Sequence, residues 1–447
     1  MAHQTLTDIA ADLASGRTDP VRLVEEALDK ARAAPRVFIT LMAEEALAEA
    51  RAAAERRRSG KALGPLDGIP IAWKDLFDIA GTRTTAGSRT RDDVPPARED
   101  APVVAASRRV GLIPLGKTNL SEFAFSGLGP NPHFGTPIPD FPGVVPRVPG
   151  GSSSGSAVAV QRGIVPVGIG TDTAGSVRVP AALNGLVGFK ASGRRYDMTG
   201  VYPLAKSLDS LGPIARTVAD CATIDAVMRG AGQPVETASA APEIVVDPAV
   251  LEEDGLEDAV RANFEAVLAR LEAAGARVRR MPVAAWREAR RAIVEIGWLG
   301  AVEARAWHLE AISGPKRDLI DARIVKRLDG AAAITAEAAE RLRGLRATLT
   351  RSIADELDGA LFALPTVKHV APELELLEAD PELFARINLA TLSLTIAGSF
   401  LDMPGLAMPS GTDAEGLPTS ALFSRPSGDD DAVLAAGLWI ERSLGGR

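Results

Sequence analysis

The sequence contains little of the material from which disulfides and metal sites are built. Its 447 residues include one cysteine, Cys221, and four histidines, His3, His133, His308 and His369. A single cysteine excludes an intramolecular disulfide and any thiolate-rich metal site. Because no HExxH-type histidine pair is present either, the sequence predicts no metal ion and no cofactor.

The sequence also lacks an excess of positive charge and long apolar runs. A formal net charge of −8 argues against a nucleic-acid partner, because binding to phosphates depends mainly on cationic contacts. No run of 18 or more apolar residues occurs, so no membrane association is expected. The N-terminus has no basic patch followed by an apolar run. We therefore expect a cytoplasmic protein.

Strand-like and helix-like segments alternate along the chain. With 46% hydrophobic residues, the chain can bury a sizeable core. Strands are predicted at 111–118, 243–247, 361–365, 405–409 and 419–423. Helices are predicted at 21–33, 43–58, 100–110, 218–228, 256–274, 381–399 and 429–444, and residues 284–357 are expected to be largely helical. This alternation, without an evident linker, predicts one α/β domain over residues 1–447.

Two clusters of serine and glycine, at 150–156 and 170–176, stand out from the rest of the chain. They flank a short predicted helix and one apolar strand around residues 164–170. Ser152 and Ser176 could therefore meet at one end of a sheet. This arrangement suggests a nucleophilic serine with a second hydroxyl beside it.

Lys74 lies in an otherwise apolar strand pattern. Ile69, Ile71 and Trp73 alternate with Pro70, Ala72 and Lys74 at the period of a strand. An exposed lysine at the end of a strand is one interpretation, because lysine is seldom fully buried without a partner. If the amine is buried instead, desolvation lowers its pKa, and a neutral amine can act as a base.

Residues 111–118, GLIPLGKT, match the nucleotide-binding pattern G-x-x-x-x-G-K-T. A phosphate cradle needs a loop whose backbone N–H groups turn inward, whereas residues 112–115 form an apolar run in which Pro114 removes a donor. The segment is therefore interpreted as a strand with no nucleotide role.

Three candidate nucleophiles can be compared. Residues 151–155 match G-x-S-x-G with Ser153 at the centre, but that elbow requires a preceding strand, which Pro146 and Pro149 disfavour. Cys221 lies in a predicted helix among apolar residues, which favours a core thiol. The third arrangement combines Ser176 and Ser152 with Lys74 as the base that a serine needs.

Ser176 directly follows a predicted strand and a turn. The backbone N–H groups of Thr173, Ala174, Gly175 and Ser176 could converge on one point there. Such convergent donors form an oxyanion hole, which stabilises the negative charge that develops on a carbonyl oxygen under attack.

Five segments together resemble the amidase signature family. They are GIPIAWKD at 68–75, GKTNLSEF at 116–123, GGSSSGSA at 150–157, GTDTAGSVRVPA at 170–181 and GFK at 188–190. The similarity is strongest from about 65 to 220 and continues more weakly to the end of the chain. It implies a mixed, twisted central sheet covered by helices on both faces.

The resemblance also implies a mechanism. Ser176 would attack the carbonyl and form an acyl-enzyme, Ser152 would relay the proton from a cis peptide, and Lys74 would be the base. Asp172 and Arg178 would support this triad structurally. The function implied is a serine amidohydrolase that cleaves a carboxamide, or a related carbamate or ester. The alternative is a glutaminase-type A subunit of a tRNA-dependent amidotransferase.

The substrate is less defined by the sequence than the chemistry. The expected partners are a small-molecule amide and water, and a homodimer is compatible with the sequence. Phe134 and Phe141, in a segment rich in proline and glycine, are predicted to contact substrate together with Ser153. The mainly helical region of about 250–357 is expected to shape the substrate pocket.

Overall fold

One sheet of eleven strands runs through the computed structural model, which describes residues 4–445. The strands follow the order β1-β3-β2-β4-β6-β5-β10-β11-β9-β7-β8 across the sheet. Strand β2 is parallel to β3 and β4, whereas β4 and β6 are antiparallel, so the sheet is mixed. The strands are β1 (Phe38–Leu41), β2 (Pro70–Lys74), β3 (Ile113–Thr118), β4 (Gly168–Asp172), β5 (Val187–Lys190), β6 (Ser210–Ala215), β7 (Glu243–Val246), β8 (Arg277–Arg280), β9 (Leu361–Pro365), β10 (Gly405–Thr412) and β11 (Pro418–Ser424).

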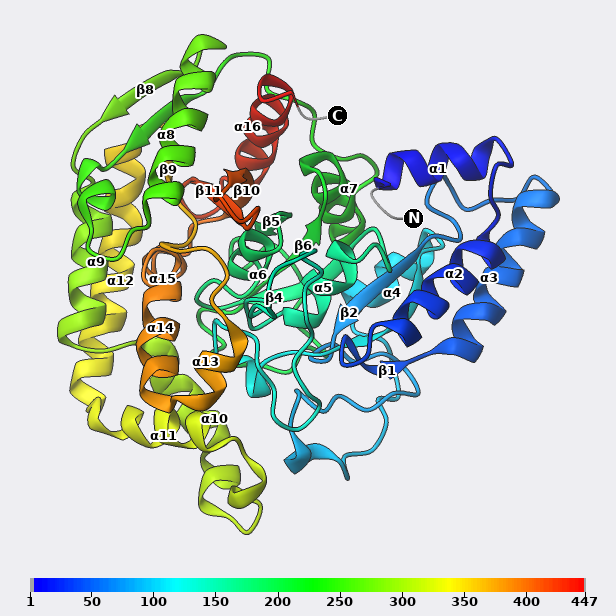
Figure 1. The fold of residues 1–447 in the computed structure, drawn as a ribbon, viewed down its shortest axis with the longest axis horizontal. Coiled ribbons are helices and arrows are strands. Elements are labelled where there is room, and N and C mark those ends of the chain that lie inside the picture. Colours follow the sequence, from blue (N-terminus) through cyan, green and yellow to red (C-terminus); the bar gives the residue numbers. More distant parts are fainter. Residues whose placement is uncertain (1–3, 446–447) are drawn as a thin grey trace.

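Helices cover the sheet, and two groups of them lie at opposite sides of the molecule (Figure 1). Helices α1 to α3 lie on one side and α9 to α15 on the other, with the central strands between them. The predicted α/β fold with a mixed central sheet is confirmed. The helices are α1 (Leu6–Ala14), α2 (Pro20–Ala33), α3 (Ala43–Arg58), α4 (Pro102–Arg109), α5 (Ser154–Gln161), α6 (Arg178–Leu183), α7 (Val218–Arg229), α8 (Asp258–Ala273), α9 (Ala284–Glu295), α10 (Leu299–Ser313), α11 (Ala322–Gly330), α12 (Ala336–Leu357), α13 (Leu374–Ala379), α14 (Pro381–Leu392), α15 (Thr395–Phe400) and α16 (Asp430–Ser443).

None of the helices within residues 4–445 is both long enough and apolar enough to cross a membrane.

Strand β2 shows how the alternation of side chains places the site. Ile71 and Trp73 pack into one apolar cluster, with Phe77, on one face of the sheet. Ala72 packs into a second cluster that includes Val158 of helix α5. Because side chains alternate between the faces of a strand, Lys74 follows Ala72 toward the face that α5 covers. The first residues of α5 continue directly from Ser152 and Ser153, so the lysine and the serine loop share one face.

The predicted helix over residues 381–399 is wrong as a single element. The structure divides it into α14, which ends at Leu392, and α15, which begins at Thr395. The Thr395 hydroxyl donates hydrogen bonds to the carbonyl oxygens of Ala174 (2.6 Å) and Leu392 (3.2 Å). The break therefore lets the second helix contact the loop that follows strand β4.

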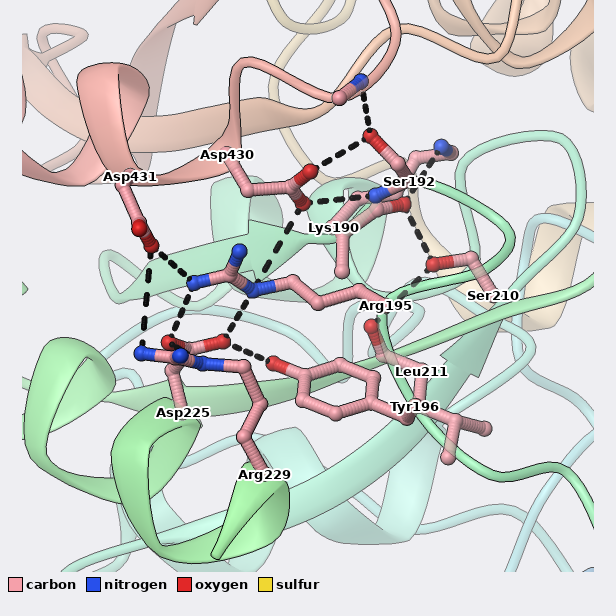
Figure 2. Close-up of polar contacts among 12 residues, drawn as sticks. Lys190, Ser192, Arg195, Tyr196, Ser210, Leu211, Asp225, Arg229, Asp430 and Asp431 are labelled. Atoms are coloured by element: carbon pink, nitrogen blue, oxygen red, sulfur yellow. Dashed lines mark hydrogen bonds and ion pairs between the residues drawn. The ribbon is translucent and has the colours of Figure 1, made fainter. Parts of the chain in front are cut away.

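A network of charged and hydroxyl groups attaches the C-terminal helix to the rest of the fold (Figure 2). Asp430, in the first turn of α16, accepts hydrogen bonds from the Ser192 backbone N–H (2.8 Å) and hydroxyl (2.7 Å). Arg195 forms two 2.6 Å contacts with Asp225 of helix α7 and one of 2.5 Å with Asp431 of α16. The network joins segments more than 200 residues apart in sequence and holds α7 and α16 together.

Candidate active site

Lys74 lies at the end of β2 and is completely buried. Its Nζ lies 2.8 Å from Ser152 Oγ and 2.7 Å from Thr171 Oγ1. Burial lowers the pKa of the Lys74 amine to about 7, and the charges of Asp172 and Asp209 only partly oppose this shift. The exposed lysine considered from the sequence is therefore not observed, and a large fraction of the amine is neutral near neutral pH.

Ser152 occupies a tightly packed loop between the proline-rich segment and helix α5. The Gly151–Ser152 peptide bond is cis. The Ser152 carbonyl oxygen accepts hydrogen bonds from the N–H groups of Ser121 (3.1 Å) and Ser154 (2.9 Å). A Cβ added to Gly151 would lie 2.7 Å from the Ser126 carbonyl oxygen, so only glycine fits there. These contacts fix the position of the Ser152 hydroxyl beside Lys74.

Ser176 lies in the turn between β4 and α6 and lines a pocket. Its carbonyl oxygen accepts a 3.3 Å hydrogen bond from the Ser153 N–H, which joins the two serine loops. The Ser176 hydroxyl has no hydrogen-bond partner within the part of the chain that the structure describes. Among the described residues, the hydroxyls of Ser152 and Ser176 are therefore not hydrogen-bonded to each other.

The turn before Ser176 presents unused donors. Between residues 4 and 445, no acceptor pairs with the backbone N–H groups of Thr173, Ala174, Gly175 and Ser176. Gly175 has a φ of 144° and leaves no room for a side chain, because a Cβ would lie 2.4 Å from Thr395 Oγ1. Unpaired N–H groups on a turn beside a hydroxyl are the kind of donor that an oxyanion hole requires.

A buried ion pair between Asp172 and Arg178 holds the residues on either side of this turn. Arg178 Nη2 lies 2.9 Å from Asp172 Oδ1, and both side chains are almost completely buried. Asp172 Oδ2 accepts a further hydrogen bond from the Val177 N–H at 3.1 Å. Burial alone would raise the pKa of Asp172, but the contacts with Arg178 outweigh it and lower the pKa to about 2. The carboxylate therefore stays ionised and fixes the start of helix α6.

Asp209 and Thr171 are site residues that the sequence patterns did not single out. Asp209 Oδ1 accepts a 2.6 Å hydrogen bond from the Thr173 hydroxyl, and Oδ2 accepts one of 3.0 Å from the Leu204 N–H. Burial raises the pKa of Asp209, against the effect of these hydrogen bonds. Asp209 thus ties the turn at Thr173 to the pocket wall at Leu204. Thr171 could have been found from the sequence, because the alternation of side chains along β4 indicates which of its residues share a face of the sheet.

The pocket that Ser176 lines has a volume of about 640 Å³, within the usual range for small-molecule sites. One wall comes from the loop 124–127 and another from the turn at Ala174. The remaining wall comes from helices far away in sequence. The larger apolar side chains that line it are Phe125, Leu204, Ile293, Val294, Trp298, Leu389, Leu392 and Ile396.

None of the three predicted substrate-binding residues is among the described residues that line this pocket. Of the segment rich in proline and glycine, Ser126 and Gly127 line it. The guanidinium carbon of Arg89 lies over the Phe134 ring, 5.0 Å from the ring centroid. Neither Phe134 nor Phe141 is among the described residues that line the pocket. Ser153 is completely buried and donates to the Thr171 carbonyl oxygen at 3.4 Å. The structure therefore brings none of these three side chains to the pocket surface.

The other candidate motifs have structural explanations. Residues 113–118 of the G-x-x-x-x-G-K-T match form strand β3, and Lys117 Nζ lies 2.6 Å from Asp75 Oδ1 in a fully buried ion pair. No strand precedes Ser153 between residues 119 and 153, so it does not occupy a nucleophile elbow. Cys221 is buried in helix α7, where burial raises the pKa of its thiol well above the usual value.

No group of three or more histidine, cysteine, aspartate or glutamate side chains suited to a metal ion occurs among residues 4–445.

Comparison with solved structures supports the fold. A structure described as a crystal structure of amidase superimposes with a TM-score of 0.87 at 33% identity, covering 98% of this chain and 99% of that one. A second, described as part of a vestigial protein complex related to an s-triazine catabolic enzyme, has a TM-score of 0.86 at 28% identity and covers 99% of both chains.

Sequence comparison gives the same family. The chain is 34% identical to a 2-amino-5-chloromuconic acid deaminase of Comamonas testosteroni over 99% of this chain and 97% of that protein. It is 40% identical to the A-type subunit of the Glutamyl-tRNA(Gln) amidotransferase of Ralstonia nicotianae, over 62% of this chain and 61% of the relative. The family model for Amidase matches residues 22–434. The chain therefore belongs to the amidase family and is a hydrolase that acts on amide C–N bonds.

Proposed function

We propose that this protein is a serine amidohydrolase that cleaves small carboxamides with Ser176 as nucleophile, Ser152 as proton relay and Lys74 as base. One observation carries the proposal: a completely buried amine, with a pKa lowered to about 7, lies 2.8 Å from the Ser152 hydroxyl. A neutral amine can accept a proton from a hydroxyl, whereas an ammonium group cannot.

The proposed reaction begins when Ser176 Oγ attacks the substrate carbonyl carbon. Its proton passes to Ser152 Oγ while the Ser152 proton passes to Lys74 Nζ. The N–H groups of the turn at 173–176 hold the oxyanion. The lysine then returns the proton through Ser152 to the departing nitrogen, and the C–N bond breaks. Water hydrolyses the resulting ester on Ser176 by the same proton path in reverse, which releases the acid and restores the enzyme.

The helical region of about 250–357 is proposed to select the substrate. Ile293 and Val294 of helix α9, Trp298 before α10 and Arg327 of α11 line the pocket together with Ser176. Because these side chains are large, substitutions among them would change the shape of the pocket while leaving Lys74, Ser152 and Ser176 in place.

Two alternatives follow from the comparisons. The relative from Comamonas testosteroni is named as a deaminase of an amino-substituted acid and aligns over nearly the whole chain, which favours release of ammonia from such a compound as a second candidate. The glutaminase-type subunit remains the other candidate. The similarity to that class of protein spans less than two thirds of the relative from Ralstonia nicotianae, which favours it less.

The experiment is a substrate screen with the purified chain and its Ser176→Ala variant. The panel contains primary amides, anilides, carbamates, conjugated amino acids and glutamine, with ammonia or amine release as the measurement. We expect turnover of at least one amide class and a loss of about 10⁴-fold or more in the variant. A variant with wild-type turnover would contradict the proposal. Turnover of glutamine only when a partner protein is added would favour the amidotransferase alternative.

A further inference from the structure

Two arginines line the pocket, and they differ in how their charge is balanced. Arg290 forms an ion pair with Glu253, with Nη2 3.0 Å from Oε2, and its guanidinium lies over the Trp286 ring at 4.7 Å from the centroid. Arg290 therefore already has a carboxylate partner within the protein, which it shares with Lys368, whose Nζ lies 2.6 Å from Glu253 Oε2.

Arg327 of helix α11 has no such partner. Its Nη1 donates a hydrogen bond to the Phe125 carbonyl oxygen, and its guanidinium lies over the Phe125 ring at 4.1 Å from the centroid. Across the described ranges of the chain, no aspartate or glutamate forms an ion pair with it. Burial lowers the pKa of Arg327 to about 10, which leaves the group charged near neutral pH. Stacking on a ring leaves the in-plane N–H groups of a guanidinium able to bind a ligand.

The surroundings of Arg327 make the unpaired charge more unusual. No aspartate, glutamate, lysine or histidine lies among the described residues that line the pocket. Most of the lining side chains are apolar, including Phe125, Trp298 and Leu392. A cation held in such surroundings is unfavourable unless an anion accompanies it. The protein has a net charge of −8, so the two arginines of the pocket do not reflect a generally basic surface.

We propose that Arg327 determines specificity by binding a carboxylate of the substrate, so that the enzyme acts on amides that carry a second, anionic end. This inference rests on the proposed function. The guanidinium and Ser176 line the same pocket, so one small molecule can contact both. A carboxylate fits better than a phosphate ester because a single unpaired cation balances one negative charge, and its two oxygens match the fork of an arginine.

A purely structural role for Arg327 would have a different consequence. Its contact with the Phe125 carbonyl oxygen supports the loop 124–127, which lines the pocket for any substrate. Loss of that support would lower activity toward charged and neutral amides alike. Loss of carboxylate binding would instead lower the preference for the charged amide, chiefly through KM.

The test compares succinamate, glutaramate and adipamate with butanamide, pentanamide and hexanamide, which are the neutral amides of the same chain lengths. We expect the wild type to prefer at least one charged amide by about tenfold or more in kcat/KM. Arg327→Met should reduce that preference by about 10- to 100-fold, and Arg327→Gln, which keeps a donor for the Phe125 carbonyl oxygen, should do the same. Arg327→Lys, which keeps a charge, should fall between them and the wild type.

Lys326→Met is the matched control, because Lys326 is exposed and adjacent on the same helix but does not line the pocket. It removes one positive charge and should leave the preference unchanged. Equal rates for charged and neutral amides in the wild type, or a preference that survives in Arg327→Gln, would overturn the inference while leaving the hydrolase proposal intact.

Calorimetric binding of the same charged amides to Ser176→Ala separates the two proposals. Suppose that the charged amides bind to Ser176→Ala, that this binding is lost when Arg327→Gln is also introduced, and that the wild type turns over no compound of the substrate screen. That result would support the carboxylate site and contradict the proposed hydrolysis. Absence of both binding and turnover would contradict both.

Discussion

The motif region of residues 65–220 and the helical region beyond it contribute to the same pocket in opposite ways. Around the proposed triad, the charged side chains are buried and paired: Lys74 contacts two hydroxyls, and Asp172 pairs with Arg178. At the pocket edge, the helices leave apolar side chains in water, with Val294 85% and Leu389 67% exposed. Under the proposed function, the chemistry therefore depends on a fully packed part of the molecule, whereas substrate selection depends on more exposed side chains.

After Ser176→Ala, the largest expected effect comes from Lys74→Met. An apolar side chain of similar length fits a buried site better than an amine, so we expect the free energy of unfolding at pH 7 to stay the same or rise. Activity toward the best amide should fall by about 10³-fold or more, because no base remains for Ser152. Denaturant unfolding and steady-state kinetics check the two parts. A variant that loses stability and activity together would break the contrast between the two regions.

Asp172→Asn should destabilise the protein by about 3–5 kcal/mol, because it leaves the buried guanidinium of Arg178 without its carboxylate. Urea unfolding monitored by circular dichroism measures this change. The control is Glu340→Gln on helix α12, which removes a pair with Arg343 that lies at the surface. That variant should unfold at nearly the same urea concentration as the wild type. Equal effects of the two substitutions would contradict the role assigned to the buried pair.

The pKa of Lys74 predicts the pH dependence of activity. Since the neutral amine is the base, kcat/KM should rise about tenfold per pH unit below pH 7 and level off above it. The same shift affects stability: the unfolded chain, with a lysine pKa of 10.5, binds more protons than the folded one. The free energy of unfolding should therefore rise between about pH 7 and 10.5 from this group.

Two measurements check the sign of that dependence. A pH profile in which kcat/KM falls as the pH rises through 7 would contradict the proposed base. The rise in the free energy of unfolding between pH 7 and 10.5 should be absent in Lys74→Met, because a methionine side chain does not titrate.

The smallest effect is expected at the pocket edge. Val294→Ser should raise KM for an amide with a long alkyl chain by a few-fold, because an exposed valine contributes little apolar contact. The change in kcat should be smaller than the change in KM, since Val294 lies in the helical region and not in the packed part of the molecule around the proposed triad. A series of amides of increasing chain length gives both constants. A larger fall in kcat than rise in KM would mean that the two regions are not separable.

The sequence predicted the residues around Lys74, Ser152 and Ser176 better than it predicted the residues that line the pocket. The strand alternation at 69–74 and the hydroxyl clusters around Ser152 and Ser176 are local patterns, so they indicated which residues the sheet would bring together. The family resemblance then supplied their roles. Asp209 gave no local signal, because its link to Thr173 depends on how β4 and β6 pair.

The pocket walls come from separate helices whose packing no local pattern encodes. Phe134 and Phe141 were chosen for their residue type in a segment rich in proline and glycine, but the path of such a loop depends on tertiary contacts. Phe125, Trp298 and Arg327 meet only because helices α9 to α11 fold back over the loop 124–127. The break between α14 and α15 was missed for the same reason, since it depends on the contact of Thr395 with Ala174.

Mass spectrometry of the protein quenched during turnover tests the assignment of Ser176 as nucleophile most directly. With a slowly deacylated ester or anilide, we expect a mass increase equal to the acyl group on the peptide that contains Ser176. That adduct should be absent in Ser176→Ala and strongly reduced in Lys74→Met. No adduct in single-turnover samples, or an adduct on Ser152, Ser153 or Cys221 in its place, would contradict the assignment.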